Sequence, residues 1–356
     1  MLRQKFDFRV ISSEARNLDK TVTETTSDIE RFMFRGLHPM VFLGTASDRY
    51  AGWIGQIYPE EIYGGKIARR SKTVGKQTVT EEVLPVESVT EYFRHFSVLE
   101  LDFTFYSLLL DKDLKPTQTY HVLETYRKYL GRNDRLILKV PQVLFAKKLW
   151  RSGSFTDNPG YLDSETFASR FYEPARNLLG DSVTAFIFEQ EYQAKKDRVA
   201  PELFAESLDG FFQHLPQDER YHVEVRTESL LSESFFKVLE KHGVGQVLSH
   251  WTWLPPLRKQ FLRGAASFLS KSAECLVRLM TPRNVRYEEA YLKAFPFDRL
   301  IDGMMSMDMV EDTVSIMQTA IEQGVYANVI INNRAGGNAP LIARKVAEKF
   351  LKDTEQ

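Results

Sequence analysis

One alternation, repeated eight times along the chain, constrains the fold more than any other feature of the sequence. A short apolar run ends in a polar or charged residue, and a stretch with helical spacing of apolar residues follows it. The runs expected to form strands are Val41–Leu43, Val98–Leu108, Arg135–Val140, Val183–Glu189, Tyr221–Arg226, Gly245–Ser249, Glu274–Met280 and Val325–Asn332. Strands separated by helices pair in parallel, and eight of them close most simply into a barrel. The sequence therefore predicts an α/β fold, a TIM-type (β/α)8 barrel.

Two stretches stand outside this alternation. Residues 1–38 are polar without sustained periodicity, so they are expected to form an N-terminal extension, and residues 39–356 a single barrel domain. Gly64–Thr80 is expected to be a long basic loop after the first strand. Its basic residues are Lys66, Arg69, Arg70, Lys72 and Lys76. The loop is either a solvated insertion or a flap that meets an anionic ligand. Helices are predicted over Glu82–Phe96 and over Ser164–Leu179, the second kinked at Pro174.

The composition excludes several classes of protein. The 356 residues are 43% hydrophobic and 27% charged, as in an ordinary globular chain. The 47 basic and 48 acidic residues give a net charge of -1, so no global field attracts nucleic acid or an anionic membrane. We expect no membrane span and no signal peptide, because no apolar stretch is long enough. The single cysteine, Cys275, excludes an internal disulfide and fits a cytoplasmic location.

Charged residues at the ends of the predicted strands mark the expected site. A buried charge without a partner is costly, so a barrel interior carries charge mainly where it opens. On the second strand, Glu100, Asp102 and Thr104 share one face because strand side chains alternate. The other strand-end residues are Lys139, Glu189, Glu224, Arg226, His250, Arg278, Asn332 and Asn333. These groups either pair in a closed core or build a site at the carboxyl-terminal mouth, and we prefer the site.

Two narrower hypotheses have weaker support. The carboxylates and His250 could hold a divalent metal, but the sequence has no HExxH motif, no CxxC pair and only 7 dispersed histidines, so no metal is predicted. The glycines of NNRAGGNAP precede a helix whose N–H groups could receive a phosphate. The alternative is a turn that needs a positive φ at Gly336 or Gly337. No cofactor and no oligomeric state can be named from the sequence.

Six motifs, in order along the chain, resemble those of the YecE-like family, also called domain of unknown function 72. Its opening motif, G-T-S-G-W followed by W-x-G-x-F/Y-Y-P, is matched by Gly44, Thr45, Trp53, Gly55, Tyr58 and Pro59. The later motifs are matched by Glu100, Thr104, Phe105, Tyr106, Lys139, Pro141, Glu224, Arg226, Arg278, Asn332, Asn333, Gly337, Ala339 and Pro340. This chain is similar to the family as a divergent member. It has Asp102 in place of Asn, Arg334 in place of His, and FEQEYQ in place of F-Q-L-P.

The resemblance implies a TIM barrel whose activity is unsettled. A relationship of that family to endonuclease-IV-like and xylose-isomerase-like barrels is one of structure and does not fix function.

Three functions are compatible with these residues. The first is an enzyme for a phosphate-bearing or other anionic substrate, with Lys139, Arg226 and Arg278 holding the anion and Glu100 or Glu224 as general base. The remaining predicted ligand contacts are Thr45, Trp53, Asp102, Glu189, His250, Asn332 and Asn333. The second is a nucleic-acid-binding barrel that uses the basic loop, Arg334, and stacking by Trp53, Trp251 or Trp253. The third is a non-catalytic binder of a small ligand.

Overall fold

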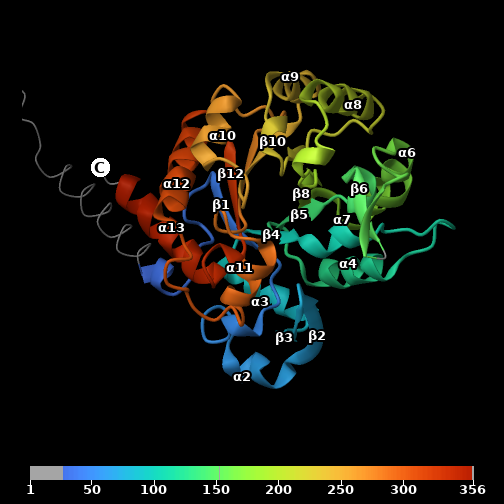
Figure 1. Ribbon diagram of the computed structural model, residues 1–356. Helices are drawn as coiled ribbons and strands as arrows, with labels where there is room; N and C mark the ends of the chain where they lie inside the picture. Colours follow the sequence, from blue (N-terminus) through green and yellow to red (C-terminus); the bar gives the residue numbers. More distant parts are fainter. Residues whose placement is uncertain (1–26, 152, 355–356) are drawn as a thin grey trace, which may run out of the picture.

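Eight parallel strands close into a barrel at the centre of the protein (Figure 1). The computed structural model describes residues 27–151 and 153–354. Around the barrel the strand order is β1, β12, β11, β10, β9, β8, β5, β4 and back to β1. Their bounds are β1 (Val41–Ala46), β4 (Val98–Leu101), β5 (Arg135–Lys139), β8 (Val183–Glu189), β9 (Tyr221–Glu224), β10 (Gly245–His250), β11 (Glu274–Leu279) and β12 (Tyr326–Ile331). This architecture confirms the predicted TIM-type α/β barrel.

Amphipathic helices surround the barrel (Figure 1). The longer ones are α3 (Val89–His95), α4 (Gln118–Tyr129), α7 (Glu173–Leu179), α8 (Pro201–Gln213), α9 (Glu233–His242), α10 (Leu257–Arg263), α11 (Tyr287–Ala294), α12 (Met307–Glu322) and α13 (Ala339–Thr354). The short ones are α2 (Glu60–Tyr63), α5 (Gln142–Phe145) and α6 (Ser164–Phe167). Local signals set their ends: Ser232 caps α9 by accepting from the Phe235 N–H, and Gly243 ends it with φ at 68°.

The barrel interior is filled in three levels. At the amino-terminal end, Glu274 pairs with Arg135 at 2.5 Å and accepts from the Asn328 amide at 2.5 Å. The middle level is apolar and contains Val98, Ile137, Ala185, Ile187, Val247, Leu276 and Ile330. The level at the carboxyl-terminal mouth is ionic. Because the apolar level separates the two polar ends, the mouth is closed from below by packed side chains.

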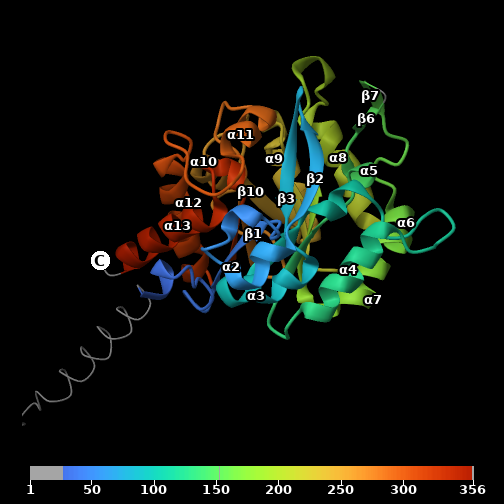
Figure 2. The ribbon, with the colours of Figure 1, turned by 90° about the horizontal axis from the view of Figure 1, so that it is seen from below.

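The predicted basic loop Gly64–Thr80 is wrong in its conformation. Most of it belongs to an antiparallel hairpin of β2 (Ala68–Val74) and β3 (Gln77–Val83), a separate two-stranded ribbon (Figure 2). Gly75 makes the turn with φ at 60°. The hairpin also shortens the helix predicted from Glu82. Three of its basic residues pair across the strands, Arg69 with Glu82 and both Arg70 and Lys72 with Glu81.

Three further expectations differ from the structure. The second strand ends at Leu101 rather than Leu108, and Asp102–Tyr106 form a 3₁₀ turn. The helix predicted over Ser164–Leu179 contains a π-helical turn over Ala168–Tyr172, just before Pro174. A second hairpin, β6 (Lys148–Arg151) with β7 (Ser154–Asp157), was not predicted.

The predicted N-terminal extension lies mostly outside the described residues. Residues 1–26 are not described, whereas residues 27–38 pack against the barrel. Ile29 and Phe34 are buried in the main core, and Arg35 pairs with Asp134 at 2.7 Å. The division into an extension and one barrel domain stays a prediction.

Candidate functional site

Six charged side chains from five strands converge at the carboxyl-terminal mouth of the barrel. They are Glu100, Lys139, Glu189, Glu224, Arg226 and Arg278, and we call them the mouth cluster. Alternation along each strand turns these residues inward, above the apolar level. The predicted strand ends include all six residues, and the ion pairs show that their side chains meet. That they form a functional site stays a prediction.

Arg278 is the deepest member of the mouth cluster. Its side chain is 1% exposed, and those of Glu100 and Glu224 are 0% exposed. Arg278 donates from Nε and Nη2 to the two oxygens of Glu100, at 2.7 and 2.6 Å, and from Nη1 to Glu224. Such a two-pronged pair fixes the guanidinium plane. Arg278 is therefore held rigidly between two buried carboxylates.

Glu189 lies nearer to solvent and receives three cations on one oxygen. Its Oε2 is 2.6 Å from Lys139 Nζ, 2.8 Å from Arg226 Nη2 and 3.4 Å from Arg278 Nη1. Its side chain is 13% exposed. Arg226 Nε also lies 3.0 Å from Glu224, an ion pair whose angle does not suit a hydrogen bond. Three fixed donors thus converge on a single point at the mouth, and that point holds an oxygen of the protein itself.

The mouth cluster balances three carboxylates against three cations. Burial raises the pKa of Glu189, but the cations Arg226, Lys139 and Arg278 outweigh burial and bring the pKa well below its ordinary value. For Glu100, burial dominates over Arg278 and raises the pKa. With all six groups ionised the mouth cluster is neutral. An anion can therefore reach the three cations only in competition with Glu189.

Aromatic rings support the cations. Lys139 Nζ lies 3.9 Å from the centroid of Phe105, and the Arg226 guanidinium lies 3.9 Å from the centroid of Trp251. At the rim, Arg334 lies 4.3 Å from the centroid of Tyr287. Within residues 27–151 and 153–354, Arg334 has no carboxylate at ion-pair distance, and its buried Nε has no hydrogen-bond partner. Arg334 is thus a rim cation that remains available to a ligand.

Several predicted ligand residues lie away from the mouth. Thr45 is fully buried and bonds the Tyr92 hydroxyl on helix α3. Trp53 is also fully buried and donates to Asn333 Oδ1 at 3.1 Å. His250 lies on the outer face of β10 with Leu248, and burial lowers its pKa to about 4. These residues build the wall of the barrel, and their ligand contacts stay predictions without support from this placement.

The remaining predicted residues lie at the rim. Asp102 does not share a strand face with Glu100, because the chain turns at Leu101, and its Oδ1 accepts from Ser47 at 2.5 Å. Asn332 caps the turn after β12 by accepting from the Arg334 N–H at 3.0 Å. Gly337, rather than Gly336, has a positive φ, of 113°. Asn333 Oδ1 accepts from the Ala339 N–H at 2.7 Å, so a bond within the chain takes that donor at the start of α13.

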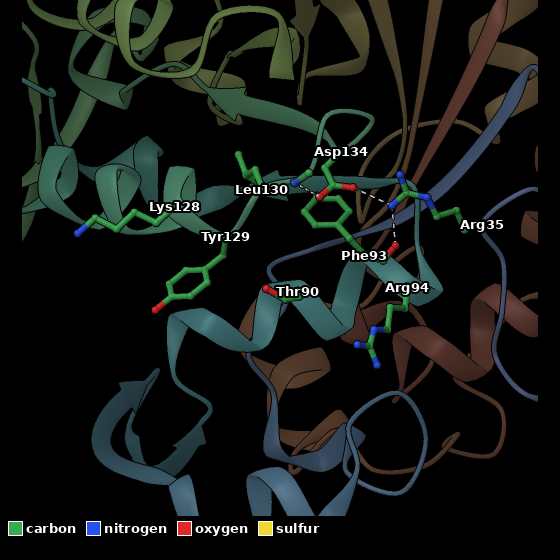
Figure 3. A pocket seen from close by; sticks show the side chains of 9 residues that line it. Arg35, Thr90, Phe93, Arg94, Lys128, Tyr129, Leu130 and Asp134 are labelled. Carbon is green, nitrogen blue, oxygen red and sulfur yellow. Dashed lines mark hydrogen bonds and ion pairs between the residues drawn. The ribbon is translucent and has the colours of Figure 1, made fainter.

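Two surface cavities of the described part of the chain lie away from the mouth. A cavity of about 440 Å³ lies at the opposite end of the barrel, between α3 and the loop after α4 (Figure 3). Its lining includes Arg35, Arg94 and Lys128, and Asp134 neutralises Arg35 within it.

Among the described residues, no three His, Cys, Asp or Glu side chains gather as a metal site requires. No helix of the described part has the length and apolar character needed to cross a membrane.

A family model described as "Protein of unknown function DUF72" matches residues 75–356. The chain belongs to the DUF72 family. A DUF72 family protein from Thermotoga maritima has a similar structure, with a TM-score of 0.50, 16% identity, and coverage of 89% of this chain and 100% of that one. A DUF72 family protein from Enterococcus faecalis matches with a TM-score of 0.50, 14% identity, and coverage of 88% and 96%. No curated protein matches the sequence.

Membership in DUF72 confirms the resemblance to the YecE-like family, and at these identities the solved structures support the fold alone. The predicted ligand residues do not include Tyr106, Tyr287 or the buried carboxyl of Asp48. Tyr106 was matched to a family motif beside Phe105, and that match could have marked it as a ligand residue. Asp48 and Tyr287 carry no local signal, because only the folded chain brings them to partners.

Proposed function

We propose that this DUF72 protein binds a small anionic ligand, such as a phosphate-bearing metabolite, at the carboxyl-terminal mouth of its barrel. The observation that carries the proposal is the convergence of Lys139, Arg226 and Arg278 on a single oxygen of Glu189. Fixed cationic donors at one point suit an oxyanion, because charge-assisted hydrogen bonds are about twice as strong as neutral ones. A ligand oxygen would take the place of the Glu189 carboxylate.

The proposed role of each residue follows from how deeply its side chain is buried in the mouth. Lys139 and Arg226 would contact the ligand, since their side chains, 8% and 5% exposed, are less deeply buried than that of Arg278. Arg278 would act from below, held in place by Glu100 and Glu224. The predicted general-base role of Glu100 and Glu224 remains part of the proposal, but either carboxylate must leave Arg278 before it can take a proton. Binding therefore has stronger support than a chemical step.

Titration of phosphate into the protein and into a Lys139→Gln variant tests the proposal. Losing one of the three converging donors should weaken phosphate binding at least about tenfold, since a charge-assisted bond contributes about 1.5–3 kcal/mol. Lys147→Gln is the matched control, because Lys147 is exposed and has no ion-pair partner among the described residues. Equal phosphate affinity in the Lys139 and Lys147 variants would contradict an anion site at the mouth.

Exposed aromatic pairs favour a second candidate, the binding of single-stranded nucleic acid. Trp150 and Phe155 are 63% and 65% exposed with centroids 4.9 Å apart, and Tyr192 and Trp253 lie 6.0 Å apart. Such rings can stack with bases. The basic hairpin gives this candidate little support, because Arg69, Arg70 and Lys72 already pair with the carboxylates of Glu81 and Glu82. A Trp253→Ala variant that binds oligothymidylate as well as the parent would count against it.

A further inference from the structure

The mouth cluster continues outward into a group of aromatic side chains. Thr104 fixes the turn Asp102–Tyr106 by donating to the carbonyl oxygens of Leu101 at 2.9 Å and Lys139 at 2.7 Å. The turn brings Phe105 against Lys139 Nζ, and the ring of Tyr106 lies 5.5 Å from that of Phe105, centroid to centroid. Tyr106 is therefore a near neighbour of the point where the three cations converge, and its backbone is tied to the same strand end.

Tyr106 is open to solvent although its neighbours are not. It is 69% exposed, whereas Thr104 is fully buried and Lys139 is 7% exposed. The ring packs edge-on against Phe105, at an interplanar angle of 80°. That contact leaves the faces of the Tyr106 ring without a stacking partner among the aromatic pairs of residues 27–151 and 153–354. An aromatic face held in place beside a charged site is a platform on which a planar group can stack.

The Arg334–Tyr287 pair borders the same space. Arg334 follows the end of β12 and Tyr106 follows the end of β4, and these two strands flank β1, so both residues lie on the same side of the rim. The Arg334 guanidinium lies 4.3 Å from the centroid of the Tyr287 ring, and its buried Nε bonds nothing in the described chain. A guanidinium in this position offers N–H donors to acceptor atoms on the edge of a ring.

We infer that the ligand of the mouth is a phosphate ester that carries a planar heteroaromatic ring, with Tyr106 and the Arg334–Tyr287 pair forming the subsite for the ring. This inference rests on the proposed anion site and adds the class of ligand. A nucleoside 5′-monophosphate has the required parts: a phosphate for Lys139 and Arg226, a ring face for Tyr106, and ring-edge acceptors for Arg334. Because a phosphate must compete with Glu189 for the three cations, a second contact to the ring would strengthen binding.

Calorimetric titration with adenosine 5′-monophosphate, ribose 5-phosphate and inorganic phosphate tests the inference. The nucleotide should bind at least about tenfold more tightly than ribose 5-phosphate, which corresponds to about 1.4 kcal/mol. For Tyr106→Ala, the affinity for the nucleotide should fall to within about twofold of the affinity for ribose 5-phosphate. The affinity for ribose 5-phosphate should equal that of the parent. Tyr106→Phe should keep the preference, because it keeps the ring face.

A matched control and three outcomes make the test decisive. Tyr129→Ala removes a tyrosine that is 40% exposed at the opposite end of the barrel, and it should change no affinity. Equal binding of nucleotide and ribose 5-phosphate by the parent would overturn the ring subsite and leave the anion site standing. Loss of ribose 5-phosphate binding in Tyr106→Ala would also overturn it, because Tyr106 would then serve the anion. Failure of all three compounds to bind would overturn the anion site as well.

Discussion

Replacing Arg278 by Met should destabilise the protein more than any comparable change on its surface. The variant leaves Glu100 and Glu224 buried without the guanidinium that both now bond. Breaking a buried pair by removing one partner costs about 3–5 kcal/mol. Met fills much of the Arg volume, so the loss reports charge rather than a cavity. The free energy of unfolding, obtained from urea titrations followed by circular dichroism, measures it.

The loss of unfolding free energy in Arg278→Met should depend on pH, which gives a second measurement. Burial raises the pKa of Glu100, and Arg278 opposes that rise. Without Arg278 the pKa of Glu100 rises further. An acid whose folded pKa exceeds its unfolded pKa contributes stability at low pH that is lost as the pH rises. The difference in the free energy of unfolding between the parent and Arg278→Met should therefore be larger at pH 8 than at pH 5.

The control for this prediction is Arg263→Met. Arg263 pairs with Glu228 at 2.6 Å, the same distance as that from Arg278 Nη2 to Glu100, but the side chains of Arg263 and Glu228 are 40% and 50% exposed. Exposed pairs of this kind contribute about 0.2–1 kcal/mol. If the two Met variants lose equal stability, burial of the mouth cluster does not govern its energetics and the reasoning fails.

Two further predictions concern buried groups. Burial raises the pKa of Asp48 from 3.8 to about 6, so the parent loses stability as the pH rises through 6, and Asp48→Asn does not. The stability of Asp48→Asn relative to the parent should improve by about 2 kcal/mol between pH 4 and pH 8 in urea titrations. The Cys275 thiol is buried and its pKa is raised by that burial, so a thiol reagent should label it only at the rate of unfolding. Rapid labelling of native protein would contradict this.

The barrel could be predicted because its signals are local. Each strand of the barrel is a short apolar run, and polar residues such as Lys139 and Glu189 mark where strands end. The sequence did not predict the hairpin of β2 and β3 because its basic residues favoured a solvated loop, although Thr and Val alternate over Thr78, Val79 and Thr80. The position of Asp102 was missed because Thr104 bends the chain by bonding the carbonyl of Lys139, on the neighbouring strand.

The pairing of the charges could not be predicted from the sequence. Arg278 on β11 reaches Glu100 on β4 across the barrel interior, and these strands are not neighbours. Which carboxylate meets which cation depends on the closure of the barrel, and this information lies in no single segment. Trp53 matched a motif and was therefore expected at the site. In the folded chain it is buried against Asn333, a partner far away in the sequence.

The phosphate affinity of a Glu189→Gln variant tests the central claim most directly. Gln keeps the shape of the side chain but removes the charge that competes for Lys139, Arg226 and Arg278. The mouth cluster then carries a net positive charge, and phosphate should bind at least about tenfold more tightly than to the parent, with an advantage that shrinks as salt is added. An unchanged or weaker phosphate affinity in folded Glu189→Gln protein would contradict the claim that Glu189 occupies an anion site.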